Sequence, residues 1–105
     1  MIARLRTPIG AYAAEETPDG RGGFSTHWVF FTKLWAHIDA RSGRETDNNG
    51  RRVVSQDYTV IIHYRDDLPE RLRLMWGDRI LRVITMSDPD NRRERLHLIC
   101  EEEQQ

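Results

Sequence analysis

The second half of the sequence is built from short stretches in which apolar and polar residues alternate, each followed by a turn signal. The clearest stretch spans 53–65, and its regular part places four apolar or aromatic residues on one side: Tyr58, Val60, Ile62 and Tyr64. A side-chain period of two residues belongs to a β-strand with one buried face, whereas a helix would scatter these residues around its axis. This periodicity restricts the chain to a fold made mainly of strands.

Five further stretches favour strands, at 7–14, 25–40, 71–76, 80–86 and 95–100. Segments rich in Pro, Gly, Asp and Asn separate most of them, as expected for turns. About six antiparallel strands at short spacing predict an all-β fold, a small single-domain β-barrel that covers residues 1–105. Closure into a barrel would remove the open sheet edges that such a β-meander otherwise leaves.

Residues 41–56 interrupt this pattern with a long polar run that contains two glycines and two asparagines. The run is too polar to pack and too long for a hairpin turn, so we expect one long loop, with a short helical turn near 44–49. Unstructured loops of this length in a compact domain are usually functional or disordered. Arginines at 41, 44, 51 and 52 make it the most basic local segment, which suits contact with DNA phosphates or ordering against a neighbouring chain.

Composition narrows the classes of protein that remain. Charged residues make up 31% of the 105 residues, and no stretch approaches the ~20 apolar residues of a membrane-spanning helix. The N-terminus lacks the apolar core of a signal peptide, so we expect an intracellular protein at synthesis and no membrane partner. The net charge of −1 argues against a whole-surface nucleic-acid binder.

Residues that could carry chemistry are scattered. The four histidines lack metal-ligand spacing, and Asp66 and Asp67 are neighbours in a strand-like stretch, where they would point to opposite faces. Cys100 is the single cysteine, which excludes an internal disulfide, and it alternates with Leu98 and Leu96 as a buried residue would. We therefore expect no catalytic residue, no metal site and no cofactor, and hence no enzyme.

Trp35 lies opposite Leu34 and Ile38 in the alternation, so it should be exposed if those two point inward. An exposed tryptophan suggests a subunit contact. Lys33 is the only lysine among sixteen basic residues, and arginine suits paired contacts with carboxylates at interfaces. The candidate interface residues are Trp35, Arg41, Arg65 and Arg79.

The sequence resembles the head-tail joining, or head-closure, family of tailed phages and gene transfer agents. The resemblance rests on three stretches, which are LWAHIDARSGRE at 34–45, YTVIIHYRDDL at 58–68 and LMWGDRILRVITMSDPDNRRERLHLIC at 74–100. They look like the family patterns W-A-x-I-x-x-x-S-G-x-E, I-x-[IV]-R-Y-R and the long ending that closes on L-x-L-x-C. TPDGRGGFSTHW at 17–28 also matches the usual D-x-x-G before a tryptophan.

The resemblance implies a small barrel that assembles as a ring, expected to hold twelve copies, at the neck of the particle. The ring would join the portal or its adaptor to the tail or tail terminator, with packaged double-stranded DNA passing through the channel. In some members of the family the long loop faces the channel and helps to retain DNA. Carried over by position, the gating residues are Ser42, Gly43, Arg44, Glu45, Thr46, Asp47, Asn48, Asn49, Gly50, Arg51 and Arg52.

Two alternatives stay open at this stage. A tail-completion or tail-terminator protein also builds rings of small barrels, so it would share most of these features. A small barrel that binds single-stranded nucleic acid belongs to another class, and its aromatic residues would stack on bases. The near-neutral charge counts against this second alternative.

Overall fold

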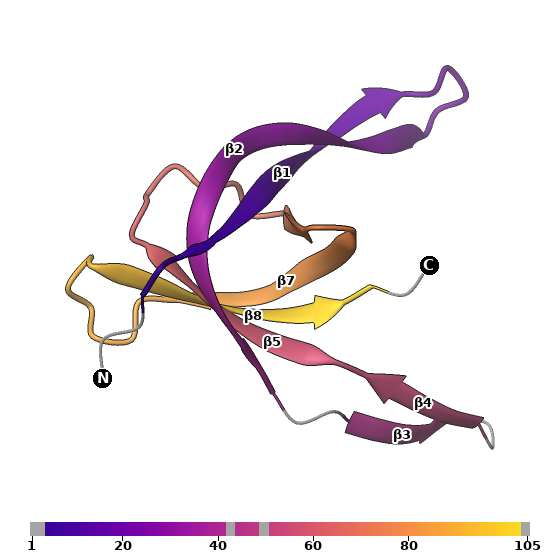
Figure 1. Cartoon of the computed structure of the whole chain (residues 1–105). Coiled ribbons are helices and arrows are strands. Elements are labelled where there is room, and N and C mark those ends of the chain that lie inside the picture. The colour runs from indigo at the N-terminus through magenta and orange to yellow at the C-terminus, as the bar shows by residue number, and fades with distance from the viewer. Residues whose placement is uncertain (1–3, 42–43, 49–50, 104–105) are drawn as a thin grey trace.

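A computed structural model of the chain describes residues 4–41, 44–48 and 51–103. Six strands form one closed antiparallel barrel in the order β1-β2-β5-β8-β7-β6 (Figure 1). They are β1 (Thr7–Pro18), β2 (Phe24–Ala40), β5 (Asp57–His63), β6 (Leu72–Trp76), β7 (Arg79–Ser87) and β8 (Arg95–Glu102). The prediction of an all-β barrel of about six strands is therefore confirmed.

The barrel core follows the alternation in the sequence. In the β5–β8 register Val60 lies opposite Leu98, and Ile62 lies opposite Leu96. All four side chains are buried. Because inward residues of neighbouring strands face each other, the two alternating patterns fill one interior between them. The residues of the core cluster are Ile9, Ala11, Leu34, Ala36, Tyr58, Val60, Ile62, Leu72, Leu74, Leu81, Leu96, Leu98 and Cys100.

The prediction of a structureless loop with a helical turn at 41–56 was wrong. Two short strands, β3 (Arg44–Asn48) and β4 (Arg51–Ser55), pair antiparallel as a separate hairpin. No helix occurs within the described residues, and so none that could cross a membrane. The long strand expected at 53–65 is likewise divided at Gln56, because Val53–Ser55 belong to the hairpin and the barrel strand begins at Asp57.

A sequence signal for this hairpin exists. Asn-Gly is the favoured pair for a two-residue hairpin turn, and Asn49 and Gly50 stand between β3 and β4, outside the described residues. The backbone register pairs Asn48 with Arg51, which leaves Asn49 and Gly50 as the two residues between the strands. A polar strand pair of this kind lacks the apolar alternation by which the barrel strands were predicted.

The β1–β2 hairpin continues beyond the barrel. β1 pairs with β6 only over Gly10–Ala13, whereas its pairing with β2 runs on to Pro18 and Phe24. Figure 1 shows this hairpin and the β3–β4 hairpin projecting separately from the barrel. The radius of gyration is 15.6 Å, compared with about 13 Å for a compact domain of this length. The two hairpins therefore offer surface that the barrel does not need for its own folding.

Cys100 should behave as an inert thiol. Its side chain is fully buried, and burial raises its pKa to about 12. Because the thiolate is the reactive form, we expect an aromatic disulfide reagent to label the folded protein only as slowly as it unfolds. In guanidinium the same thiol should react at once. Immediate stoichiometric labelling of the folded protein would show that Cys100 is accessible and would contradict this assignment.

Candidate functional site

The large apolar side chains exposed on the described part of the chain lie on two strands only. Five belong to β2 and form what we term the β2 patch, which consists of Phe24, Val29, Phe30, Phe31 and Trp35. Two belong to β7 and form the β7 patch, which consists of Ile84 and Met86. In the β2 patch, Phe24, Phe30 and Trp35 share one face of the β1–β2 pair, and Val29 lies on the other. Exposed apolar patches mark interaction sites in soluble proteins. These two patches are therefore the first candidates for the working surface of the protein.

Trp35 is 50% exposed, while Leu34 is buried and Ile38 packs against the core. The outward orientation expected from the alternation is confirmed. The Lys33 ammonium lies 4.9 Å from the centre of the Trp35 ring, which is cation–π distance. The tryptophan is thus held at the surface beside a positive charge.

Further along β2, aromatic rings cover the outer face of the β1–β2 pair. The rings of Tyr12 and Phe30 meet edge to face with centroids 5.6 Å apart. Gly10 leaves room for them, since a Cβ there would lie 3.2 Å from a Tyr12 ring carbon. The Arg73 guanidinium lies 4.4 Å from the centre of the Trp28 ring. The outer face of β2 therefore combines aromatic rings with cations.

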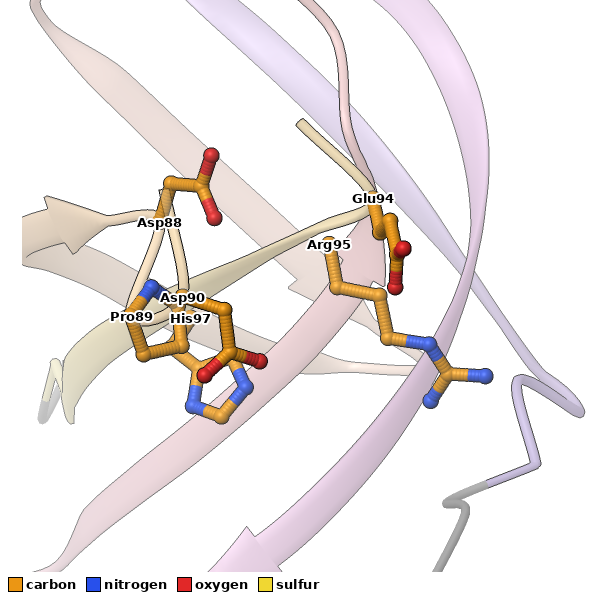
Figure 2. A pocket seen from close by; sticks show the side chains of 6 residues that line it. All are labelled: Asp88, Pro89, Asp90, Glu94, Arg95 and His97. Atoms are coloured by element: carbon orange, nitrogen blue, oxygen red, sulfur yellow. The ribbon is translucent and has the colours of Figure 1, made fainter. Parts of the chain in front are cut away.

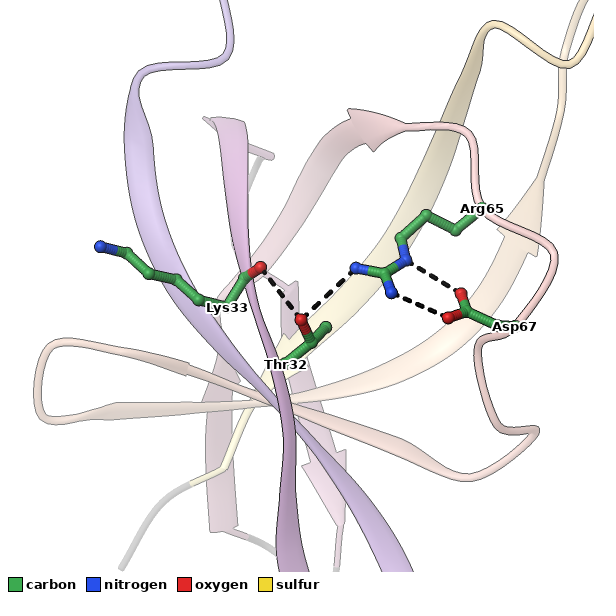
Figure 3. A network of polar contacts seen from close by, with 4 residues as sticks. All are labelled: Thr32, Lys33, Arg65 and Asp67. Atoms are coloured by element: carbon green, nitrogen blue, oxygen red, sulfur yellow. Dashed lines mark hydrogen bonds and ion pairs between the residues drawn. The ribbon is translucent and has the colours of Figure 1, made fainter.

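Arg65 is held in a defined position beside this surface. It donates two hydrogen bonds to Asp67, from Nε to Oδ1 at 2.9 Å and from Nη2 to Oδ2 at 2.8 Å (Figure 3). Its Nη1 points to the Thr32 hydroxyl on β2 at 3.5 Å, and its guanidinium lies 5.8 Å from the Phe31 ring. The hydrogen bonds from Arg65 lower the pKa of Asp67. This ion pair is exposed, so it orients Arg65 more than it stabilises the fold.

Arg79 lies elsewhere, at the end of the barrel where β5 begins. Its Nη1 donates to the Tyr58 hydroxyl at 3.3 Å, and that hydroxyl donates to Glu102 at 3.0 Å. The guanidinium also lies 4.9 Å from the centre of the Trp76 ring, which meets Tyr58 edge to face. Arg79 thus closes one end of the core.

Arg41 belongs to the same end, next to the base of the β3–β4 hairpin. Its N–H donates to the carbonyl of Asp57 at 2.8 Å, and its own carbonyl accepts from the Gln56 side chain at 2.6 Å. The four candidate interface residues therefore form two pairs: Trp35 and Arg65 near the His63 end of β5, and Arg41 and Arg79 near its Asp57 end. The structure does not gather them into one surface.

Tyr58, at the barrel end next to the β3–β4 hairpin, should make the stability of the protein depend on pH. Burial raises its pKa above 10.0, and the hydrogen bond with Glu102 adds to the shift. The pKa of Tyr58 is higher in the folded protein than in the unfolded chain. The stabilisation from its protonated hydroxyl is therefore complete below about pH 10 and is lost as the pH rises above that value. Between about pH 9 and about pH 11, the free energy of unfolding from urea curves should fall less for Tyr58→Phe than for the unmodified protein. Parallel stability profiles for the two proteins over that range would refute the coupling.

The β3–β4 hairpin leaves the barrel at this same end. The Gln56 carbonyl accepts from the Glu102 N–H at 3.0 Å, which fixes the end of the hairpin to β8. Strands of five residues reach about 17 Å from that base. Of the predicted gating residues, Arg44–Asn48 and Arg51–Arg52 lie in the hairpin strands. Ser42, Gly43, Asn49 and Gly50 lie outside the described residues.

A shallow polar pocket lies at the β7–β8 turn, where Figure 2 shows side chains that point in different directions. Asp88 uses its carboxylate to accept a hydrogen bond from the Arg93 N–H at 2.8 Å, and its carbonyl accepts from the Asn91 N–H at 3.1 Å. These bonds build a turn in which Asn91 and Arg93 both have positive φ. The lining residues are Asp88, Pro89, Asp90, Glu94, Arg95 and His97.

Metal ligation finds no support among the residues that the structure describes, where no group of three or more His, Cys, Asp or Glu converges. The Nε2–H of His37 donates to the Oδ1 of Asp39 at 3.0 Å on the same strand. That contact is a pair at the protein surface.

Comparison with solved structures shows the same fold in two other chains. A solved chain described as belonging to the virion of a native gene transfer agent particle matches with a TM-score of 0.82 and 24% identity, over 98% of each chain. Protein SF1141 from Shigella flexneri 2a matches with a TM-score of 0.71 and 26% identity, over 96% of this chain and 95% of that one. No curated protein sequence matches the chain.

The family comparison covers almost the whole sequence. Residues 1–103 match the model of the phage head completion protein family. The barrel described above has the same fold as the gene transfer agent chain, and the matched residues include every stretch on which the resemblance rested. The chain therefore belongs to the phage head completion proteins, a family of structural virion components.

Proposed function

We propose that this protein closes the filled head as a ring, expected to hold twelve copies, at the neck of the particle. The ring would join the portal or its adaptor to the tail or tail terminator. One observation carries the proposal: a closed barrel bears a polar hairpin at one end, and the hairpin pairs with no barrel strand among the described residues. A barrel suits a ring wall, and an independent hairpin suits a channel lining.

The mechanism that we propose is steric and electrostatic. Copies of the β3–β4 hairpin, each reaching about 17 Å, would converge on the axis and narrow the channel around packaged double-stranded DNA. Arginines 44, 51 and 52 would meet the phosphates, while Glu45 and Asp47 would limit how tightly the DNA is held. A gate of this kind retains DNA without any bond being made or broken.

Cryo-electron microscopy of purified particles tests this assignment directly. We expect density for a ring of this barrel between the portal complex and the tail, with the β3–β4 hairpins nearest the axis. A ring with the hairpins on its outer side would support the joining role but would exclude the proposed gate. A barrel found at the tail end of the neck would instead favour the tail-completion alternative. Absence of the barrel from the neck would refute the proposed function.

One observation favours a second candidate, binding of single-stranded nucleic acid. Trp35 with Lys33, and Trp28 with Arg73, pair an aromatic ring with a cation on the outer face of β2, and such pairs can stack on bases. Binding of this kind would weaken steeply as salt rises. We expect no binding of a labelled oligonucleotide at physiological salt, and tight, salt-sensitive binding would support this candidate.

A further inference from the structure

We propose that the β2 patch of one copy binds the β7 patch of the next copy, so that these two surfaces are the two halves of a single repeated contact. The inference deepens the proposed function, since it rests on assembly of the chain into a ring. It assigns a partner surface to Ile84 and Met86, which sequence analysis did not single out.

The position of the two patches within the barrel carries the argument. In the closed order β1-β2-β5-β8-β7-β6, β2 and β7 are three strands apart in either direction, so they lie on opposite sides of the barrel. A contact that joins opposite sides of a subunit is heterologous, and its repetition closes into a ring when the rotation between copies permits. A single patch would instead favour an isolated two-fold dimer.

Both patches also lie on open strand edges. β2 pairs with β5 only over Ala36–Ala40, and its residues 24–35 pair with β1 alone among the described residues. β7 pairs with β6 only over Arg79–Arg82. Among the described residues, the edge of Val83–Ser87 that faces away from β8 has no strand partner. Open edges with exposed apolar side chains favour association with another strand. Each patch therefore has both side chains and backbone available to a partner.

Charge distinguishes this contact from pairing of like patches. Lys33 stands within the β2 patch, and it has no carboxylate partner in the described part of the chain. Residues 83–87, which hold the β7 patch, carry no charge, and the turn 88–94 that follows holds two arginines beside its three carboxylates. Two β2 patches would bring lysine against lysine, whereas β2 against the uncharged β7 patch avoids that repulsion. The second copy therefore presents its β7 patch.

Cysteine cross-linking in purified particles tests the contact. Pro8 is exposed opposite Trp35 on β1, and Thr85 is exposed between Ile84 and Met86, so Pro8→Cys and Thr85→Cys mark the two patches without removing them. Native Cys100 is buried and should stay silent. With a short bismaleimide, the double variant should give a ladder of cross-linked species above the dimer. Each single variant, as a matched control, should stay monomeric.

The outcomes separate this proposal from the proposed function. Dimers from Pro8→Cys alone would show β2 patches facing each other and would overturn the inference. The absence of a ladder in particles that contain both labelled cysteines and a neck ring would also overturn it, while leaving the ring intact. Absence of the protein from the neck would instead refute the proposed function.

An assembly variant gives an independent readout. We expect Met86→Asp to fold normally by circular dichroism, since Met86 is exposed, and to be lost from particles because a carboxylate would be buried in the contact. Ser87→Asp is the matched control, because it adds the same charge one residue further along, outside the β7 patch. Equal incorporation of the two variants would count against the proposed contact.

Discussion

Removal of the β3–β4 hairpin should leave a folded protein whose particles lose their packaged DNA. The change deletes residues 45–52 and replaces Val53 and Val54 with Asn-Gly, so that a favoured two-residue turn joins the paired residues Arg44 and Ser55. No residue of the core cluster is removed, and we expect the free energy of unfolding to change by no more than about 1 kcal/mol. Particles should assemble, and most of them should lack DNA.

The measurement is the fraction of DNA-filled particles by electron microscopy, together with tail attachment. A hairpin of natural length with Arg51→Gln and Arg52→Gln separates the two parts of the mechanism. Partial DNA loss in that variant would assign a share of retention to charge, whereas full retention would make the gate steric. Normal DNA content and tails in the deletion variant would exclude a gating role for the hairpin.

Truncation of Ile62 should be among the most damaging single substitutions in the barrel. The side chain is fully buried between Ala36 of β2 and Leu96 of β8 in the sheet register. Ile62→Ala should cost about 3 kcal/mol, because the lost burial is compounded by a cavity that the closed barrel cannot collapse. For a domain of this size the melting temperature should fall by about 10–20 °C, measurable by scanning calorimetry.

Ile84→Ala is the matched control, since it makes the same chemical change on the same fold. Ile84 is 51% exposed, so its truncation should change stability by no more than about 0.5 kcal/mol. The same substitution should weaken assembly if the β7 patch contacts a neighbouring copy. Equal loss of stability in the two variants would mean that Ile84 is packed in the folded monomer and would contradict its place at the surface.

Several parts of the fold were accessible from the sequence because they depend on a local property. Alternation with a period of two assigned Tyr58, Val60 and Ile62 to the interior, and it assigned Trp35 to the surface. It also predicted the number of barrel strands, since each alternating stretch ended at a turn signal. These inferences needed no knowledge of which strands pair.

The β3–β4 hairpin was missed because its residues are mostly polar and show no alternation of apolar and polar residues, so nothing in their periodicity distinguished strands from loop. The β7 patch was missed for a different reason. Residues 79–87 carry apolar side chains on both faces, and a register shift between Val83 and Thr85 changes which of them face the interior. Neither a bulge nor the extent of a partner strand can be read from one segment alone.

The sequence by itself determined the class of fold, the core positions of β5 and β8 and the family, because all of these rest on local periodicity and ordered motifs. Tertiary structure alone decided the pairing order, which sets β2 and β7 on opposite sides of the barrel. It also separated Arg41 and Arg79 from Trp35 and Arg65, towards opposite ends of β5. The physical reason is that relative position depends on long-range hydrogen bonding between strands, which no single stretch of the chain encodes.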